Sequence, residues 1–116
     1  HYIFNKNIAK AQTIGEKESQ LAYSQTYEPL LKGYNIALDV LGKRVDTYAF
    51  SSLIDNKNEV NFFIGGAYGF QREFLNKCDS VISLSDLTMA HKVANVVLAE
   101  QIFRSLCIQN NHPYHK

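Results

Sequence analysis

The sequence predicts an α/β protein with a mostly parallel sheet flanked by helices, and three observations support this class. Short apolar runs rich in β-branched and aromatic residues alternate with longer segments of helical periodicity, as strand then helix, four times over. A cluster of glycines directly follows the most strand-like run. The length of 116 residues and the hydrophobic content of 46% fit a single domain, residues 1–116, with a buried core.

The N-terminal part contains one expected strand and one expected helix. Tyr2–Phe4 is a short apolar run that we interpret as the end of a strand. The segment 8–31 has helical character in its middle, from Thr13 onward, and Pro29 limits the C-terminal end of this helix. Gly33 separates the helix from the next element.

The next strand and helix are expected within residues 34–56. The strand is expected at Tyr34–Asp39, with a turn at Val40–Lys43. Asp39 could bond a substrate or a loop, but initiation of the turn is the interpretation that turn preferences favour. Thr47 is expected to cap a helix at Tyr48–Asn56, which has apolar side chains on one face.

The second half of the chain contains two further strands and two further helices. Val60–Ile64 is expected to be a strand buried on both faces, and a helix is expected at Gln71–Cys78. The last strand is expected at Val81–Leu84. The loop Ser85–Met89 then connects it to a final helix at Ala90–Ile108.

The final helix is apolar on more than one side. A helix of this kind must be buried on two sides. We expect its own sheet to cover one side and a second copy of the chain to cover the other. Its apolar residues are Val93, Val96, Val97, Leu98, Ile102, Phe103, Leu106, Cys107 and Ile108.

Composition and charge exclude one class and leave others open. No run of about 18 apolar residues is present, so we exclude a transmembrane span, and no signal peptide is visible. The net charge of +1 gives no global argument for nucleic-acid binding. From His91 onward, however, Lys92, Arg104 and Lys116 stand against Glu100 alone, which makes a modest basic end able to contact phosphate.

The cysteines and histidines do not favour a disulfide framework or a metal site. Cys78 and Cys107 are isolated from each other in sequence, and buried unreactive thiols in a reducing cytoplasm are the default expectation. His112 and His115 lie in a terminal tail that need not be helical, so we expect no metal there.

The glycine cluster Gly65, Gly66 and Gly69 is the main candidate for a ligand site. Open α/β sheets bind ligands at the carboxyl ends of their strands, and glycines let the backbone come close to a ligand. A simple chain turn is an equal alternative for the glycines taken alone. The spacing matches neither a phosphate loop nor a dinucleotide fingerprint, and no nucleophile elbow is present.

Apolar residues accompany both loops at the expected strand ends. Leu38, Leu84, Leu87 and Met89 lie beside loops that are rich in backbone donors. Such a combination suits a planar heterocycle, for example the adenine of a cofactor.

Five groups of residues carry a resemblance to a known family. They are Ile36-Ala37-Leu38-Asp39 with Gly42-Lys43, Phe63-Ile64-Gly65-Gly66 with Gly69, Leu84-Ser85 with Leu87-Thr88 and His91, Glu100-Gln101 with Arg104, and the tail Asn111-His112-Pro113-Tyr114-His115-Lys116. With these residues the sequence resembles the ribosomal RNA large subunit methyltransferase H family, the SPOUT-class enzymes that methylate ring nitrogen 3 of a pseudouridine in 23S rRNA. The resemblance covers essentially the whole chain, although family members begin with a further strand and helix and usually have Pro where Ala90 stands.

The resemblance implies S-adenosylmethionine as cofactor, a C-terminal trefoil knot, and a homodimer whose pocket and RNA surface come from both chains. It implies rRNA of the large subunit or the assembled ribosome as partner. The implied cofactor contacts are Leu38, Gly65, Leu84, Ser85, Asp86, Leu87, Thr88 and Met89. The implied catalytic residues are Arg104, Tyr114 and His115, and the implied substrate contacts are His91, Arg104, His112 and Tyr114.

Several of these assignments have alternatives. Arg104 could instead form a structural ion pair with Glu100 at helical i, i+4 spacing. His115 is a conceivable general base, but a terminal histidine can equally be a surface residue. For the whole chain, the alternatives are a non-catalytic RNA-binding or ribosome-associated α/β module and a flavodoxin-like nucleotide-binding protein.

Overall fold

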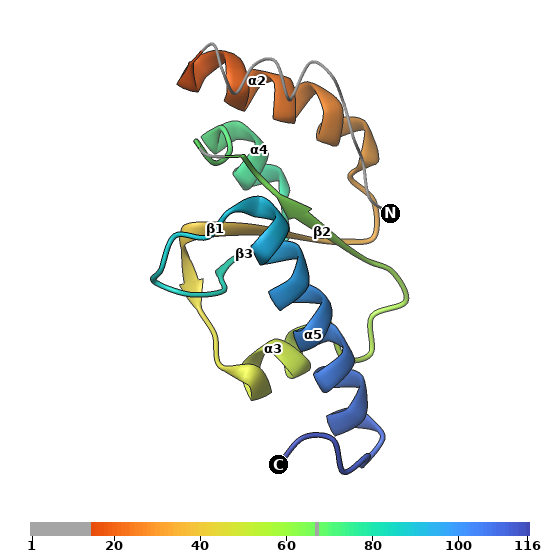
Figure 1. Cartoon of the computed structure of the whole chain (residues 1–116). Helices are drawn as coiled ribbons and strands as arrows, with labels where there is room; N and C mark the ends of the chain where they lie inside the picture. The colour runs from red at the N-terminus through yellow and green to blue at the C-terminus, as the bar shows by residue number, and fades with distance from the viewer. Residues whose placement is uncertain (1–14, 67) are drawn as a thin grey trace.

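The computed structural model describes residues 15–66 and 68–116 and arranges them in three layers (Figure 1). Within these residues the middle layer is a sheet of β1 (Tyr34–Arg44), β2 (Val60–Ile64) and β3 (Ser80–Ser83). The strands lie in the order β2-β1-β3, and both pairings are parallel. The predicted α/β class with a parallel sheet is therefore confirmed.

One face of the sheet is covered by α2 (Glu16–Tyr27) and α4 (Arg72–Lys77). Their side chains build a largely aromatic core with the strands, made of Tyr23, Ala37, Phe63, Phe70 and Phe74. Phe63 meets Phe74 edge-on with ring centroids 5.4 Å apart, and Phe70 stacks on Phe74 at 4.9 Å. α2 ends where Pro29 was expected to limit it, and the short 3₁₀ turn Glu28–Leu30 follows.

The other face is covered by α3 (Thr47–Ile54) and α5 (His91–Gln109), which also pack against each other. Their core with the sheet consists of Ile36, Leu38, Phe50, Ile82 and Leu98. Successive residues of β1 thus join opposite cores, because side chains of a strand alternate between its two faces. This alternation is why the central strand reads as a continuous apolar run in the sequence.

β1 is longer than predicted. The turn expected to close it at Val40–Lys43 is wrong, because the strand continues through these residues to Arg44. After a shift in register, Lys43 and Arg44 pair with β3 again. The backbone crosses β3 so closely that a Cβ at Gly42 would lie 2.7 Å from the carbonyl carbon of Ile82. Only a residue without a side chain fits this approach, which gives Gly42 a packing reason.

Asp39 takes the role that turn preferences favoured. Its Oδ1 accepts a hydrogen bond of 2.9 Å from the backbone N–H of Leu41, two residues on. This is the local bond by which an aspartate initiates a turn. The strand therefore bends at Asp39 and continues, rather than ending there.

The cap of α3 lies one residue earlier than predicted. Asp46 is the N-cap, and its Oδ1 accepts a hydrogen bond of 2.8 Å from the backbone N–H of Ala49. The prediction of Thr47 as the cap is wrong because the carboxylate of Asp46 already satisfies that donor. Elsewhere the predicted bounds of the later elements agree within one residue, and those of β2 coincide with the structure. The strand expected at Tyr2–Phe4 lies outside the described residues.

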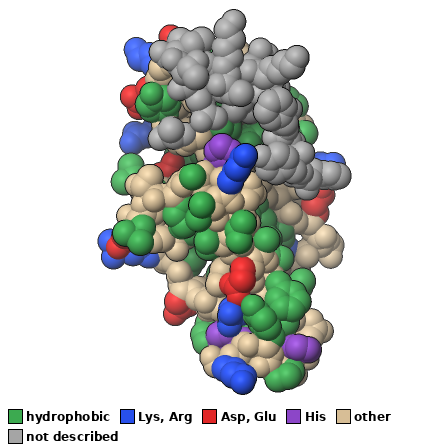
Figure 2. Space-filling model, in the orientation of Figure 1, with side chains coloured by type: hydrophobic (Ala, Val, Ile, Leu, Met, Phe, Trp, Pro, Cys, Tyr) green, Lys and Arg blue, Asp and Glu red, His purple; other side chains and the backbone are tan. Residues whose placement is uncertain are grey.

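α5 buries one side and exposes the other. Leu98 and Ile102 join the core, whereas Val93, Val96, Phe103 and Leu106 are 50%, 70%, 50% and 49% exposed. Their spacing of three, seven and three residues puts these four side chains along one face of the helix. We call this set the outer stripe of α5. Apolar side chains gather on the face of the molecule along which α5 runs (Figure 2). None of the described helices is both long and apolar enough to cross a membrane.

Candidate functional site

The first candidate region is the carboxyl edge of the parallel sheet. Leu38 of β1 pairs with Ile64 of β2 on one side and with Ile82 of β3 on the other. The chain segments that follow these three residues therefore begin side by side at this edge. They are the bend at Asp39, the glycine loop, and the loop that leads to α5. Sheets of this kind bind their ligands at this edge.

The glycine loop is tightly folded on itself and on α2. The backbone N–H of Gly69 donates a 3.1 Å hydrogen bond to the carbonyl of Gly66, and Gly69 has a positive φ of 72°. A Cβ at Gly66 would lie 2.7 Å from the ring of Tyr23, and one at Gly65 would lie 3.1 Å from the ring of Phe70. These glycines thus have a structural reason of their own, besides any contact with a ligand.

The loop between β3 and α5 is ordered by its own serines. The Ser83 hydroxyl donates to the Ser85 carbonyl at 2.9 Å, and the Ser85 hydroxyl accepts from the Leu87 N–H at 3.0 Å. Asp86 forms an exposed ion pair with Arg44 at 2.9 Å. Leu87 projects with 75% of its surface exposed. The loop therefore presents a large apolar side chain from a backbone that two serine hydrogen bonds hold.

The remaining residues predicted to bind the cofactor differ in what they expose. Leu38 is 8% exposed and belongs to the core, so only its backbone faces this edge. Leu84 and Met89 are half-buried, and Thr88 is exposed. The apolar flank predicted from Leu38, Leu84, Leu87 and Met89 is thus provided on the surface by the last three.

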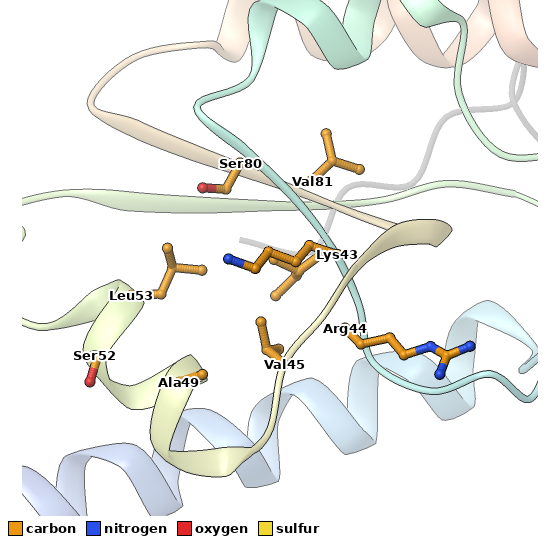
Figure 3. Close-up of a pocket in the computed structure, with 9 residues that line it drawn as sticks. Lys43, Arg44, Val45, Ala49, Ser52, Leu53, Ser80 and Val81 are labelled. Atoms are coloured by element: carbon orange, nitrogen blue, oxygen red, sulfur yellow. The ribbon is translucent and has the colours of Figure 1, made fainter.

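Two hollows lie beside the face of the sheet that α3 and α5 cover. The larger, of about 550 Å³, lies between the end of β1, α3 and β3, and Figure 3 shows Lys43 extending over it while Arg44 points away. It contains none of the predicted site residues. Its lining residues are Lys43, Arg44, Val45, Ala49, Ser52, Leu53, Ser80, Val81 and Ile82.

The smaller hollow, of about 280 Å³, lies between the loop after β3 and the middle of α5. It is bounded by Leu84 from the loop after β3, by Val97 and Gln101 from α5, and by the N-terminal turn of α3. Of the residues predicted to bind the cofactor, Leu84 is the one that this hollow includes.

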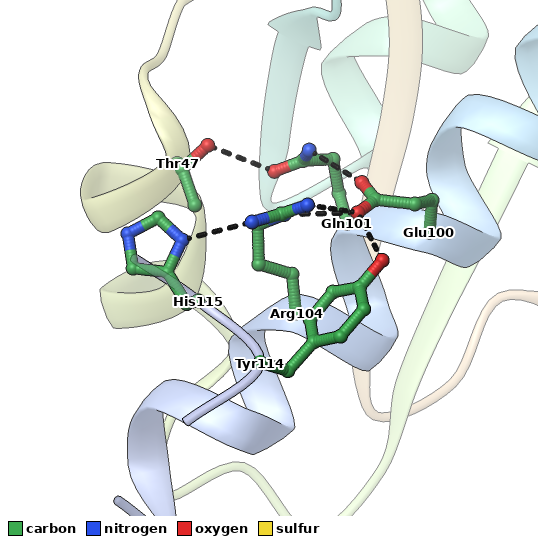
Figure 4. Close-up of polar contacts among 6 residues, drawn as sticks. All are labelled: Thr47, Glu100, Gln101, Arg104, Tyr114 and His115. Carbon is green, nitrogen blue, oxygen red and sulfur yellow. Dashed lines mark hydrogen bonds and ion pairs between the residues drawn. The ribbon is translucent and has the colours of Figure 1, made fainter. Parts of the chain in front are cut away.

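The second candidate region is a polar network on the second half of α5. Nη2 and Nε of Arg104 lie 2.7 Å and 2.9 Å from Oε1 of Glu100, and the Tyr114 hydroxyl donates to the same oxygen at 3.1 Å (Figure 4). The ion pair proposed as the alternative for Arg104 is therefore present. Hydrogen bonding from Arg104, and then from Tyr114, lowers the pKa of Glu100, and Glu100 in turn raises the pKa of Arg104.

The tail, residues 112–116, folds back onto this network. Nη1 of Arg104 lies 3.1 Å from Nδ1 of His115, and the Arg104 guanidinium carbon lies 4.7 Å from the Tyr114 ring centre. The His112 ring accepts the backbone N–H of Tyr114 at 3.2 Å. Thus Arg104, His112, Tyr114 and His115, which the sequence grouped as tail and helix residues, lie together.

Three members of the network were not among the predicted site residues. The Nε2 of Gln101 donates to Glu100 at 2.8 Å, and the Thr47 hydroxyl donates to Gln101 at 3.0 Å. The Tyr48 hydroxyl lies 3.0 Å from Nε2 of His115. Gln101 is adjacent to Glu100 in one of the motifs above, but no sequence signal points to Thr47 or Tyr48. Their contacts depend on how α3 packs against α5.

His91 is not brought to the tail within one chain. It begins α5, and 13 residues of helix at about 1.5 Å each separate it from Arg104 by roughly 20 Å. The loop after β3 adjoins the same end of the helix as His91. The two candidate regions of one chain therefore lie toward opposite ends of α5. Within the described residues, no group of three His, Cys, Asp or Glu side chains is placed to hold a metal ion.

A parallel sheet with loops gathered at its carboxyl edge defines an α/β protein of a ligand-binding type, and this architecture serves many functions. The comparison of families gives the class. The model of the predicted SPOUT methyltransferases matches residues 3–115. The chain therefore belongs to the SPOUT methyltransferase family.

Relatives at the level of single proteins share one name. The chain is 99% identical over 116 residues to the ribosomal RNA large subunit methyltransferase H of Aliarcobacter butzleri (strain RM4018), covering 100% of this chain and 77% of that relative. It is 57% identical to the protein of this name from Wolinella succinogenes, and 51% identical to that from Campylobacter concisus, each over 98% of this chain. The chain spans about three quarters of the length of these relatives, 75% and 76% for the latter two.

Proposed function

We propose that this chain transfers a methyl group from S-adenosylmethionine to ring nitrogen 3 of a pseudouridine in 23S ribosomal RNA. The observation that carries the proposal is the 99% identity, over the whole chain, to a relative named ribosomal RNA large subunit methyltransferase H. The loops gathered at the carboxyl edge of the sheet support it, because ligands of such sheets bind there. Its substrate would be the large subunit or the assembled ribosome, which places its work in the cytoplasm.

The residues at the carboxyl edge fit S-adenosylmethionine in chemistry. Leu87 offers an exposed apolar surface for an adenine ring, and the bonds of Ser85 hold the loop backbone in place. Leu38 would contribute backbone groups, since its side chain lies in the core. We assign the cofactor contacts to Leu38, Gly65, Leu84, Ser85, Asp86, Leu87, Thr88 and Met89.

Methyl transfer requires the protein to position the acceptor nitrogen and to balance the charge near it. When bound, S-adenosylmethionine supplies a methyl group that is already activated as a sulfonium. The chain must hold the acceptor nitrogen in line and help it lose its proton. We assign this placement to Arg104, Tyr114 and His115. The Tyr114 ring is 41% exposed and can stack on a base, and Arg104 can offset negative charge near the acceptor.

The RNA contacts would extend over both ends of α5. His112 and Tyr114 lie in the tail beside Arg104. His91 directly follows the loop between β3 and α5, residues 84–90, which we call the cofactor loop. We assign substrate binding to His91, Arg104, His112 and Tyr114. Cationic and aromatic side chains of this kind contact phosphates and unstacked bases in RNA.

We further propose that the active form is a homodimer. The outer stripe of α5 is a set of large apolar side chains that one chain leaves exposed. The cofactor loop and the tail lie toward opposite ends of α5, so an antiparallel partner could bring the tail of one chain to the cofactor loop of the other. A C2 interface would build two such sites at once. The C-terminal trefoil knot stays a prediction from the family resemblance.

Calorimetric titration with S-adenosylmethionine tests the cofactor assignment. We expect saturable binding by the parent chain and at least about tenfold weaker binding by Leu87→Glu, because an adenine would have to desolvate the introduced carboxylate. The matched control is Leu21→Glu on α2, where the side chain is 47% exposed and lies on the opposite face of the sheet. Absence of binding by the folded parent would contradict the assignment.

Methyl transfer to ribosomes tests the reaction itself. The chain would be incubated with isotopically labelled cofactor and large subunits or whole ribosomes, and the rRNA nucleosides would then be separated and identified by mass spectrometry. We expect label on a pseudouridine at the ring nitrogen. Label elsewhere would contradict the position but keep the enzyme class. Cofactor binding without transfer to any ribosomal preparation would favour a non-catalytic RNA-binding module.

A further inference from the structure

We propose that Tyr48 is a positioning residue, which together with Arg104 holds the His115 imidazole in one orientation and as the neutral tautomer that carries its proton on Nε2. The significance for catalysis rests on the proposed function, in which the tail places the RNA. The arrangement of the side chains itself does not depend on that function, so it can be tested separately.

The tautomer follows from what each partner can donate. The Arg104 guanidinium has N–H groups and no acceptor. Because its Nη1 lies 3.1 Å from Nδ1 of His115, Nδ1 must be the unprotonated, accepting nitrogen. A neutral imidazole then carries its single N–H on Nε2, which lies 3.0 Å from the Tyr48 hydroxyl. The Tyr48 oxygen therefore accepts this bond, and its own proton is left free to point elsewhere.

The aromatic contact adds a second constraint on the ring. Tyr48 and His115 meet edge-on, with ring centres 5.1 Å apart and an angle of 83° between the ring planes. The hydrogen bonds fix the in-plane direction of the imidazole, and the edge contact fixes its tilt. A ring held at both nitrogens and against one edge has one orientation available.

These contacts form a closed cycle of hydrogen bonds that joins three segments of the chain: the start of α3, α5 and the tail. Thr47 bonds Gln101, Gln101 bonds Glu100, Glu100 bonds Arg104, Arg104 bonds His115, and His115 returns to Tyr48, the neighbour of Thr47. The first turn of α3 thus holds both α5 and the tail. Loss of the Tyr48 bond would break this cycle between α3 and the tail.

The held arrangement uses both ring nitrogens of His115. Arg104 from α5 donates to Nδ1, and the Tyr48 hydroxyl from α3 accepts from Nε2, while Glu100 and Tyr114 contact Arg104. Because Nδ1 accepts the Arg104 N–H, its lone pair is not available to take up the proton of the acceptor nitrogen while this bond is kept. In this proposal His115 therefore orients the tail, which replaces the general-base role that the sequence left open.

Nitrogen-15 NMR of the whole chain tests the arrangement without any need for activity. At alkaline pH, two-bond correlations should show His115 with an unprotonated Nδ1 and a protonated Nε2, with its signals assigned by their loss in His115→Asn. Heteronuclear relaxation should show residues 115 and 116 less ordered in Tyr48→Phe than in the parent and in Ser52→Ala, whereas Tyr114 keeps its own contacts with Glu100 and Arg104. Ser52 is the matched control because it is an exposed hydroxyl residue of the same helix. A proton on Nδ1, or a tail equally ordered in Tyr48→Phe, would overturn the proposal.

Transfer kinetics then test the role of His115. We expect Tyr48→Phe to raise KM for the ribosomal substrate about fivefold with little change in kcat, the effect of one neutral hydrogen bond. The same change should have no further effect in a His115→Ala chain, since the two residues act through one contact.

Asparagine at position 115 separates positioning from proton transfer. Its side-chain oxygen can accept the bond from Arg104 but cannot take a proton, so His115→Asn should retain a higher rate than His115→Ala. A loss of about 100-fold or more in both His115→Asn and His115→Ala would identify His115 as the base and overturn the proposal. If no chain transfers methyl groups but the NMR results hold, the proposed function fails and the positioning of His115 by Tyr48 stands.

Discussion

At the scale of single residues, Glu100 is the centre of the tail network. Its carboxylate accepts bonds from Arg104, Tyr114 and Gln101, and the side chains of Glu100 and Arg104 are 36% and 26% exposed. An ion pair with this exposure is partly screened by water, so its contribution to stability is modest. Its main effect is to hold the Arg104 guanidinium in the direction that reaches His115.

The lowered pKa of Glu100 predicts a pH dependence of stability. A carboxyl whose pKa is lower in the folded than in the unfolded chain stabilises the fold above its unfolded pKa, and this is lost as pH falls through the folded pKa. The parent should therefore melt at a higher temperature than Glu100→Gln near neutral pH, and the difference should shrink as pH falls below the ordinary glutamate value of 4.5. Thermal unfolding followed by circular dichroism measures this.

The matched control for Glu100 is an exposed ion pair elsewhere. Glu59 and Lys32 lie 3.9 Å apart with 49% and 73% of their side chains exposed. We expect Glu59→Gln to change the melting temperature less than Glu100→Gln at neutral pH. Equal melting temperatures of the parent and Glu100→Gln at every pH would contradict the prediction.

Cys78 is predicted to be unreactive in the folded chain. Burial, and then the neighbouring Asp79 charge, raises the pKa of its thiol from 9.0 to about 11. The reactive thiolate is thereby reduced about 100-fold at neutral pH. Alkylation with iodoacetamide, located by peptide mass spectrometry, should therefore be slow at Cys78 in the native chain and fast in urea. Rapid native labelling of Cys78 would contradict this. Cys107, which is 6% exposed, should also become reactive only on unfolding.

At the scale of elements, the path of β1 depends on a close crossing. β1 leaves the register of β3 after Leu38 and rejoins it at Lys43, and Gly42 is the residue whose backbone approaches Ile82. This crossing directs the chain into α3, and so positions Tyr48 and Thr47 beside α5. A short-range packing constraint in the sheet is thereby linked to the tail network.

Gly42→Ala should destabilise the chain by about 1–3 kcal/mol, because the new methyl group would overlap the Ile82 backbone, which cannot move aside as a side chain can. Urea denaturation followed by circular dichroism measures the change. Gly15→Ala is the control, since among the described residues a Cβ there meets the flexible end of Glu18 at 3.1 Å and no backbone atom. Equal stabilities of the two variants would show that the crossing is not as close as described.

At the scale of the whole molecule, one chain leaves an apolar side of α5 uncovered. α5 has its inner side in the core and its outer stripe exposed, while the loop after β3 and the tail lie toward its two ends. Large exposed apolar sets on a folded domain mark interaction surfaces. In the homodimer proposed above, a second copy would cover the stripe and bring the two candidate regions together.

Val96→Glu should weaken self-association without unfolding the chain. Val96 is 70% exposed in one chain, so a glutamate there is solvated in the monomer. In the proposed dimer, its carboxylate would be buried without an opposite charge to pair with. We expect the dimer dissociation constant to rise by about 100-fold or more, measured by sedimentation equilibrium. Val40→Glu, at a valine that is 54% exposed and outside the stripe, should leave it unchanged. A monomeric parent, or equal association of both variants, would contradict the interface.

Much of the fold was predictable because it depends on local patterns. Val60–Ile64 was predicted as a strand with the bounds that it has, and Pro29 limits α2 because proline cannot continue a helix. The prediction that this strand is buried on both faces is wrong: β2 lies at one side of the described sheet, and only Phe63 of it is buried. The site region was predictable in part. Strand ends of a parallel sheet meet at one edge, so the loops after Leu38, Ile64 and Ile82 could be grouped before the structure was known.

By itself the sequence determined the class, the order of the elements and the residues that resemble a methyltransferase family, because these depend on neighbours along the chain. Only the tertiary structure decided the continuation of β1 past Asp39, the cap at Asp46 and the bond between Tyr48 and His115. The residues of that bond are 67 positions apart, and no local pattern encodes their meeting. Their contact arises from the packing of α3 on α5, which is a property of the folded core.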